Sequence, residues 1–223
     1  MDWRIGRLGD AALLLALDER IDAATNARVH AAARRIAADR PTWVLDVVPA
    51  YASVAVFIDA DAFPTTGDPL AEAERHLRPL LARADDADME DARIVEIPVR
   101  YGGDEGPDLE RVAAQTGLST GDVLRRHAAG EYTVAMLGFA PGFPYLLGLD
   151  PVLATPRLAT PRTRVPAGSV AIGGAQTGLY PRPGPGGWNL IGRTDAVLFD
   201  PAREPPALLA PGDRVRFLVE RAP

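Results

Sequence analysis

The chain has 223 residues, of which 47% are hydrophobic and 24% are charged, and its formal net charge is −6 at pH 7. This length allows one large or two small domains with a buried core, and the acidic balance argues against nucleic acid as the main partner. The sequence contains neither cysteine nor lysine, which excludes disulfides, thiolate chemistry, a Walker-type phosphate loop and Schiff-base chemistry.

The first hundred residues mix strand and helix patterns. Two strand-like segments flank Gly9-Asp10, a turn signal, and predict a hairpin. A second pair of apolar, alternating segments surrounds residues 49–51 and predicts another strand pair. Between the two pairs, apolar residues at helical spacing predict a helix over 21–39.

A second helix and one more strand complete this region. Asp68 followed by Pro69 is the pattern of a helix N-terminus, and the helix is expected to run toward Arg83. The acidic segment 85–91 predicts a solvated connector rather than a metal site. Residues 93–101 predict a strand, so the order β-β-α-β-β-α-β indicates an open α+β sandwich with helices on one face of its sheet.

The second half begins with two short helices and then loses helical periodicity. The first, over 108–116, ends at Gly117, and the second, near 120–129, starts with Ser119 and Asp122 in the pattern of a capping box. Short strand-like segments separated by proline and glycine follow at residues 131–137, 164–174, 177–181, 187–194, 196–200 and 213–220. They predict an all-β barrel or sandwich, and we place the domains at 1–90 and 91–223.

Residues 138–194 differ in charge from the rest of the chain. They hold five arginines and a single acidic residue, Asp150, which gives a net charge of about +4 in an otherwise acidic protein. Fixed loops that carry guanidinium groups and backbone N–H groups are typical of anion-binding sites. The alternative is that the glycines and prolines only turn the corners of a β-barrel.

The same stretch carries a family resemblance. The segments GFAPGFPYLLGL, TPRLATPRTRVPAGSVAIGG, QTGLYP, PGGW and IGRT resemble the family of the 5-oxoprolinase B subunit (PxpB), which includes the KipI histidine-kinase inhibitor and allophanate hydrolase subunit 1. The resemblance covers nearly the whole chain in length and order. It implies a small α/β N-terminal domain followed by a cyclophilin-like β-barrel.

The resemblance also implies an activity and partners. It points to the B subunit of an ATP-dependent 5-oxoprolinase, inactive alone, that works with a C subunit (KipA or allophanate hydrolase subunit 2-like) and an A subunit (LamB/YcsF-like). ATP is the expected co-substrate, at a site shared with a partner protein. The alternatives are an allophanate hydrolase or urea amidolyase type of amide hydrolysis, and a KipI-like inhibitor of a sensor histidine kinase.

Arginines in repeated contexts are the first candidate catalytic residues. Arg157 and Arg162 each follow Thr-Pro, so the prolines give both a similar local geometry, and two guanidinium groups can clamp a carboxylate or a phosphate. The alternative is a surface charge or a salt bridge to the acidic N-terminal domain. Arg193, which follows a predicted strand, is expected to complete the anion pocket.

Aromatic and glycine residues are the candidate substrate-binding groups. Aromatic side chains around Pro141-Gly142 are expected to form the wall of a site for a small flat ligand, with core packing as the alternative for at least one of them. Glycines permit close approach of the backbone to a ligand, and an amide and a phenol are expected to orient it. The predicted set is Phe139, Pro141, Gly142, Phe143, Gln176, Tyr180, Gly186, Gly187 and Trp188.

The three histidines are treated separately. His127 is a candidate general base, with a structural histidine at a helix C-terminus as the alternative. His30 and His76 are expected at the surface of amphipathic helices, and the scattered spacing predicts no metal site. No segment approaches the roughly 20 apolar residues of a membrane span, and the N-terminus lacks a signal-peptide pattern, so we expect a cytoplasmic protein.

Overall fold

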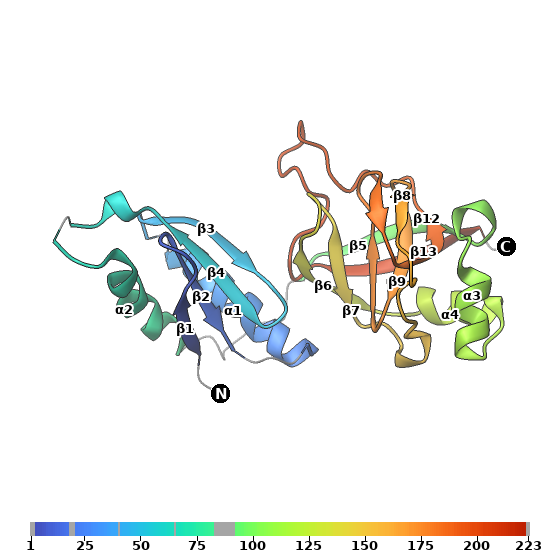
Figure 1. Cartoon of the computed structure of the whole chain (residues 1–223), viewed down its shortest axis with the longest axis horizontal. Helices are drawn as coiled ribbons and strands as arrows, with labels where there is room; N and C mark the ends of the chain where they lie inside the picture. Colours follow the sequence, from blue (N-terminus) through green and yellow to red (C-terminus); the bar gives the residue numbers. More distant parts are fainter. Residues whose placement is uncertain (1–2, 18–20, 40, 65, 83–91, 222–223) are drawn as a thin grey trace. The chain divides into compact units, whose positions relative to one another are not determined.

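The computed structural model describes residues 3–17, 21–39, 41–64, 66–82 and 92–221. The chain divides into two compact units, residues 1–91 and 92–223 (Figure 1). The predicted acidic connector at 85–91 lies outside the described residues. None of the helices in the described ranges is long and apolar enough to cross a membrane.

The N-terminal unit is a four-stranded antiparallel sheet with two helices. The sheet has the strand order β1-β2-β4-β3 (Figure 1). Its strands are β1 (Arg4–Arg7), β2 (Ala12–Ala16), β3 (Val44–Pro49) and β4 (Ser53–Ile58), and its helices are α1 (Ala23–Asp39) and α2 (Pro69–Leu81), with a 3-10 turn, η1, at Ala60–Ala62. Both predicted hairpins and both predicted helices are confirmed.

Alternation along the strands explains why the helices cover one face. Leu13 and Leu15 of β2 are buried while Leu14 between them is exposed, as expected for a half-buried strand. The buried side chains of β2 and β4 form one core cluster with those of α1 and α2. The predicted N-terminus of α2 is confirmed, because the Asp68 carboxylate accepts hydrogen bonds from the N–H groups of Leu70 and Ala71 at 3.1 and 3.4 Å.

The two histidines of this unit have different environments. His76 was expected at the surface and is there, with its Nε2 2.6 Å from Asp39 Oδ2. His30 was also expected at the surface, but it is buried. It lies one turn after Asn26 on the inner face of α1, where Asn26 donates hydrogen bonds to the carbonyl groups of Ala50 and Tyr51.

The C-terminal unit is a closed barrel of seven strands, so the predicted fold class is confirmed. Its strand order is β10-β7-β6-β13-β5-β12-β9, and β9 closes the barrel by pairing with β10 (Figure 1). The strands are β5 (Ile94–Tyr101), β6 (Tyr132–Leu137), β7 (Pro144–Leu147), β9 (Ser169–Gly173), β10 (Gln176–Leu179), β12 (Asn189–Arg193) and β13 (Arg214–Arg221). A separate two-stranded sheet pairs β8 (Arg162–Val165) with β11 (Gly184–Gly186).

Two strand predictions need correction. The strand at 93–101 was counted in the β-β-α-β-β-α-β order of the N-terminal sandwich, although the predicted domain bounds placed it at the start of the second domain. The structure places β5 in the barrel, where it pairs in parallel with β13 and antiparallel with β12. The segment 196–200 was expected to be a strand, yet it forms only an isolated bridge between Phe199 and Ala207. Proline at positions 201, 205 and 206 interrupts the chain that follows, so no extended partner strand forms there.

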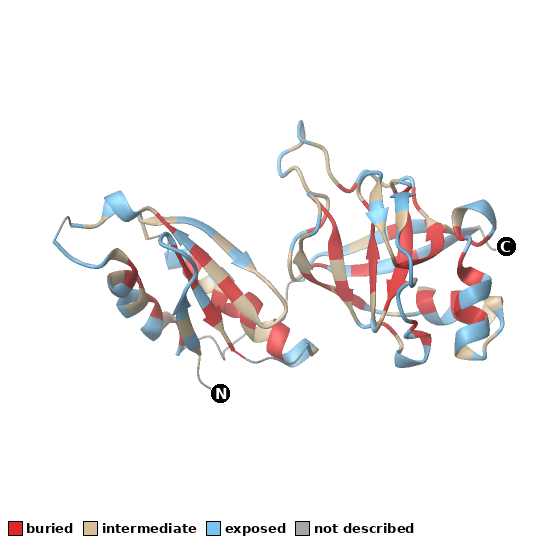
Figure 2. Ribbon diagram, viewed as in Figure 1, coloured by how far each residue is buried: buried red, intermediate tan, exposed pale blue. Residues whose placement is uncertain are grey.

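Two helices pack against the barrel. They are α3 (Leu109–Thr116) and α4 (Thr120–Ala128), and the same unit contains the 3-10 turns η2 (Gly103–Glu105) and η3 (Pro151–Leu153). Gly117 ends α3 in the left-handed conformation with φ of 71°, and the Ser119 hydroxyl caps α4 by accepting from Asp122 N–H, as predicted. Figure 2 shows the buried residues concentrated inside the barrel and along the helix faces turned to it.

Candidate functional site

The loop between β6 and β7 presents one aromatic side chain outward and buries another. Phe139 has φ of 64°, a left-handed conformation that is uncommon for a bulky residue, and its side chain is 62% exposed. Phe143, four residues later, is buried. Gly142 between them has φ of 77°, and a Cβ there would meet Phe199 Cβ at 2.8 Å, so glycine is required at this turn.

Behind this loop lies a cluster of aromatic rings. Phe143 makes edge-to-face or tilted contacts with Tyr145, Tyr180 and Trp188, at ring-centroid distances of 4.9 to 5.7 Å. Phe139 joins the cluster from outside, with its ring perpendicular to that of Tyr180 at 6.2 Å. Phe143, Tyr180 and Trp188 are therefore core residues of the barrel wall, as the packing alternative anticipated for at least one of them, and Phe139 is the member that faces solvent.

Two predicted arginines lie beside Tyr180. The guanidinium carbon of Arg157 sits over the Trp188 ring at 5.6 Å from its centroid, a cation–π contact. Arg162 lies on β8, opposite Gly186 of β11, whose Cα is so close to the Tyr180 hydroxyl that a Cβ there would overlap it. Burial raises the pKa of Tyr180, and the positive charges of Arg157 and Arg162 partly oppose that rise.

Arg162 is held by a buried carboxylate that sequence reasoning did not single out. Its Nη2 donates to Asp108 Oδ1 at 2.8 Å, and Asp108 Oδ2 accepts from Leu190 N–H at 2.7 Å. Asp108 is only 6% exposed, so this ion pair is largely desolvated. Arg162 Nη1 is buried and has no hydrogen-bond partner within the described ranges. The alternative of a salt bridge to the N-terminal domain is corrected for Arg162, because Asp108 belongs to the barrel unit.

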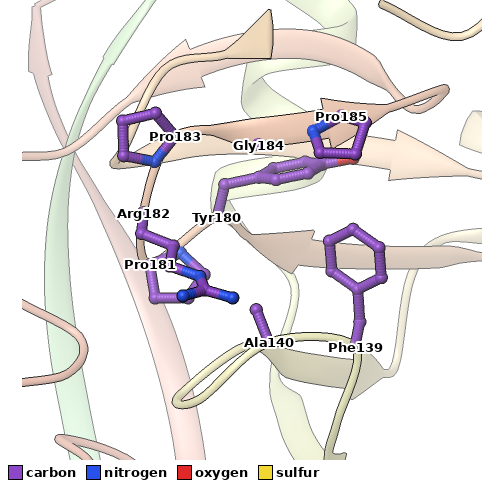
Figure 3. Close-up of a pocket in the computed structure, with 8 residues that line it drawn as sticks. All are labelled: Phe139, Ala140, Tyr180, Pro181, Arg182, Pro183, Gly184 and Pro185. Carbon is purple, nitrogen blue, oxygen red and sulfur yellow. The ribbon is translucent and has the colours of Figure 1, made fainter. Parts of the chain in front are cut away.

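A cleft opens beside Tyr180. It has a volume of about 270 Å³, and Figure 3 shows Phe139 and Ala140 along one side with the turn from Pro181 to Pro185 along the other. The Tyr180 ring lies between these walls, and the Arg182 guanidinium extends toward Ala140 (Figure 3). The cleft thus joins two predicted residues, Phe139 and Tyr180, to the stretch Arg-Pro-Gly-Pro, which lies in the predicted basic region 138–194 but whose arginine was not among the predicted site residues.

The remaining predicted residues lie near this region without lining the cleft. Arg193 donates from its Nε to the Ala167 carbonyl at 3.0 Å, and Gln176 occupies β10 opposite Gly173. The Gly187 carbonyl accepts a hydrogen bond from Leu158 N–H, and Pro141 is exposed at the tip of the β6–β7 loop. Neither Arg157 nor Arg162 is among the residues that line the cleft, although both lie close enough to Tyr180 to influence its pKa.

His127 is placed in the barrel core, which corrects the expectation of a general base. It is completely buried, and both ring nitrogens are bonded, Nδ1 to Tyr101 Oη at 2.8 Å and Nε2 to Thr177 Oγ1 at 3.0 Å. Thr177 donates its own proton to the Ala171 carbonyl, so it accepts from His127 Nε2–H, and Nδ1 accepts from Tyr101. Burial lowers the pKa of His127 to about 3. The ring is neutral and structural.

The described side chains do not assemble a metal centre, and they include one cationic residue, Arg182, that the predicted set omitted. Among the residues that the structure describes, no group of three or more His, Asp or Glu side chains could hold a metal ion. The residues that sequence reasoning missed are Arg182, the prolines beside it and Asp108. The alternation Pro-Arg-Pro-Gly-Pro is the signal that could have identified Arg182, because it fixes one cation between rigid residues.

Comparisons with known proteins give a consistent picture. A family model described as the carboxyltransferase domain, subdomain C and D, matches residues 3–209. The chain is 44% identical over 222 residues to the 5-oxoprolinase B subunit of Bacillus subtilis (strain 168), covering 97% of this chain and 92% of that protein. It is also 44% identical over 215 residues to the 5-oxoprolinase B subunit of Escherichia coli O157:H7, covering 96% and 94%.

A solved structure shares the fold over most of the chain. The crystal structure of TTHA0988 matches with a TM-score of 0.80 and 41% sequence identity over 96% of this chain. The match covers 40% of TTHA0988, so this chain spans less than half the length of that protein.

Proposed function

The chain belongs to the family of the 5-oxoprolinase B subunit, and from this membership we propose that it serves in an ATP-dependent 5-oxoprolinase, which opens the lactam of 5-oxoproline to give glutamate. The observation that carries the proposal is the 44% identity to the Bacillus subtilis protein over 97% of this chain. A match of that extent includes both structural units rather than one shared module.

The chemistry of this reaction explains what the barrel contributes. A lactam carbonyl is a weak electrophile, and transfer of a phosphoryl group to its oxygen converts that oxygen into a leaving group. Such a transfer needs fixed cations near the phosphoryl oxygens and donors near the developing negative charge. Arg157 and Arg162 bring two guanidinium groups close to Tyr180, which supports this role.

The two arginines are not equivalent in this role. Arg162 already pairs with Asp108, and its position is therefore fixed by the barrel. Arg157 is exposed and contacts the Trp188 ring through its guanidinium group, so its charge is available to a ligand. We assign Arg157 the direct contact with the anionic group. The charge of Arg162 is balanced by Asp108, so Arg162 contributes N–H donors rather than a net positive charge.

The assembly and the co-substrate are the finer parts of the proposal. The C subunit and the A subunit complete the enzyme, and ATP binds at a site to which a partner protein contributes. The chain has no lysine and no Walker-type loop, which supports a nucleotide site that this chain does not build alone. A cytoplasmic location, where ATP is available, belongs to the same proposal.

Reconstitution tests the function directly. The chain is purified with its candidate C and A partners, and glutamate and phosphate are measured with ATP and 5-oxoproline, with allophanate as the alternative substrate. We expect product from 5-oxoproline only when all three proteins and ATP are present. Production of ammonia from allophanate without turnover of 5-oxoproline would contradict the proposal.

The role of Arg157 is tested in the same assay. Arg157→Ala is expected to lower the rate by roughly 10- to 100-fold, because one donor to developing charge is lost. The matched control is Arg214→Ala, which removes an exposed arginine of β13 that lies outside both the cleft and the aromatic cluster. Equal rates for the wild type and Arg157→Ala would remove the direct contact from the proposal.

A further inference from the structure

We propose that the cleft between Phe139 and Arg182 binds the carboxylate of a small cyclic acid, with Arg182 as the residue that selects for the acid. This inference rests on the proposed function, and it assigns the substrate carboxylate to a site apart from Arg157 and Arg162. The observation that carries it is the guanidinium group of an exposed arginine, without a partner among the described residues, at the wall of a partly aromatic cleft that three prolines border.

Arg182 differs from the three arginines that were predicted to bind an anion. Arg157 contacts the Trp188 ring, Arg162 pairs with Asp108 and Arg193 donates to the Ala167 carbonyl. Arg182 has no hydrogen bond or ion pair within the part of the chain that the structure describes, and no acidic residue lines the cleft. An unmatched positive charge at the wall of a cleft favours binding of an anion there.

The turn that carries Arg182 is suited to a carboxylate rather than a phosphate. Phosphate sites commonly use several backbone N–H groups that point at the anion. Three of the cleft residues on this turn, Pro181, Pro183 and Pro185, have no N–H group to give. Arg182 is therefore the main donor of the turn, and a planar guanidinium matches a carboxylate with two parallel hydrogen bonds.

The opposite wall fits a small ring. Phe139 projects its exposed ring from a left-handed backbone, and such unusual conformations of bulky residues concentrate at ligand sites. Its ring and the edge of Tyr180 border the cleft (Figure 3). A volume of about 270 Å³ lies below the usual range for drug-sized ligands, which indicates a small guest such as a five-membered lactam acid.

Titration of the 223-residue chain, followed by NMR of the Ala140 and Gly184 amides, tests this assignment. The ligands are 5-oxoproline, 2-pyrrolidinone, which has the same ring without the carboxylate, and inorganic phosphate. In the wild type we expect saturable shifts with 5-oxoproline and much weaker binding of the other two. In Arg182→Ala, the affinity for 5-oxoproline is expected to fall roughly 10- to 100-fold, because the hydrogen bonds between the guanidinium group and the carboxylate are lost. The affinity for 5-oxoproline then approaches the affinity for 2-pyrrolidinone.

Arg214→Ala is the matched control and is expected to bind 5-oxoproline as the wild type does. The assignment is overturned if the affinity ratio of 5-oxoproline to 2-pyrrolidinone is the same in Arg182→Ala and the wild type. It is equally overturned if inorganic phosphate binds in the cleft with the same affinity as 5-oxoproline. It is also overturned if 5-oxoproline causes no saturable shift of the Ala140 and Gly184 amides in the wild type. Turnover by the reconstituted complex is measured separately, so loss of the proposed function and loss of this site are distinguishable.

Discussion

The two units of the chain differ in the burial of their ion pairs. In the N-terminal unit the described ion pairs, such as Arg7 with Asp68 and His76 with Asp39, lie at the surface. In the barrel unit the Asp108 carboxylate that pairs with Arg162 is buried, and it accepts hydrogen bonds from Arg162 and from Leu190 N–H. Exposed pairs contribute little to stability, whereas buried polar groups are costly to leave unpaired.

The difference indicates where function is located. The N-terminal core is formed by aliphatic side chains of one sheet face and two helices. The barrel, by contrast, carries an aromatic cluster, a desolvated ion pair and a cleft lined by the arginine at position 182, all within residues 108–193. A stable protein does not need these features together, and their concentration in one unit favours a binding site there.

The largest expected effect is a pH dependence confined to the barrel. Burial lowers the pKa of His127 from 6.5 to about 3, while the unfolded chain keeps a value near 6.5. Between these values the unfolded state binds more protons, so the contribution of His127 is complete above pH 6.5 and is lost as the pH falls toward 3. The full shift corresponds to about 5 kcal/mol of unfolding free energy, of which about 3 kcal/mol is lost between pH 7.5 and 4.5.

Urea unfolding at pH 7.5, 6 and 4.5 measures this effect. With Trp3 and Trp43 replaced by phenylalanine, the fluorescence of Trp188 reports on the barrel alone. In the same background His127→Gln is expected to flatten the dependence between pH 6.5 and 4.5, because it removes the titrating group. If the unfolding free energy of the barrel falls as steeply with decreasing pH in His127→Gln as in the protein with His127, the titration of a buried His127 does not cause the pH dependence.

A second effect separates two aspartates that occupy similar positions in the two units. Asp68 and Asp108 both precede a helix and both pair with an arginine, but Asp68 is exposed and Asp108 is buried. Asp108→Ala leaves the Arg162 guanidinium and the Leu190 N–H without their partner, and is expected to cost about 3 kcal/mol in urea unfolding.

The matched variant Asp68→Ala is expected to cost less. It removes the Arg7 ion pair and the cap of α2, but both partners remain open to water. If Asp68→Ala lowers the stability of its unit as much as Asp108→Ala lowers that of the barrel, burial does not account for the difference between the two units.

Local signals were enough to predict much of the fold. The cap at Asp68, the left-handed Gly117 and the Ser119 cap depend on residues within one helical turn, and all three are confirmed. Strand pairing depends on distant residues instead. The strand 93–101 was counted with the N-terminal strands in the element order, although the predicted bounds placed it in the second domain. Its parallel partner, β13, begins only at residue 214, so no local pattern reveals the pairing.

The site was predicted less completely for a similar reason. The segments with Phe139, Tyr180 and Trp188 were identified from their motifs, and the structure brings these rings together. The buried positions of Asp108 and His127 follow from how the barrel closes, which sequence spacing does not reveal. Arg182 was not predicted as a site residue, because the prolines and glycine around it are already explained by a turn. Only the cleft in the structure shows that this turn places an arginine at the wall of a candidate binding site.

The smallest expected change in stability concerns Phe139, and it separates a binding role from a structural one. Because φ at this residue is 64° and the ring is largely exposed, Phe139→Gly removes the backbone strain together with few packing contacts. The unfolding free energy is expected to stay within about 1 kcal/mol of the wild type, while the affinity for 5-oxoproline falls because one wall of the cleft is lost.

Phe143→Ala is the contrast, since removal of a buried ring costs about 3 kcal/mol or more. A loss of stability in Phe139→Gly comparable to that in Phe143→Ala would mean that the outward ring supports the barrel and that the unusual backbone at 139 serves packing rather than a ligand.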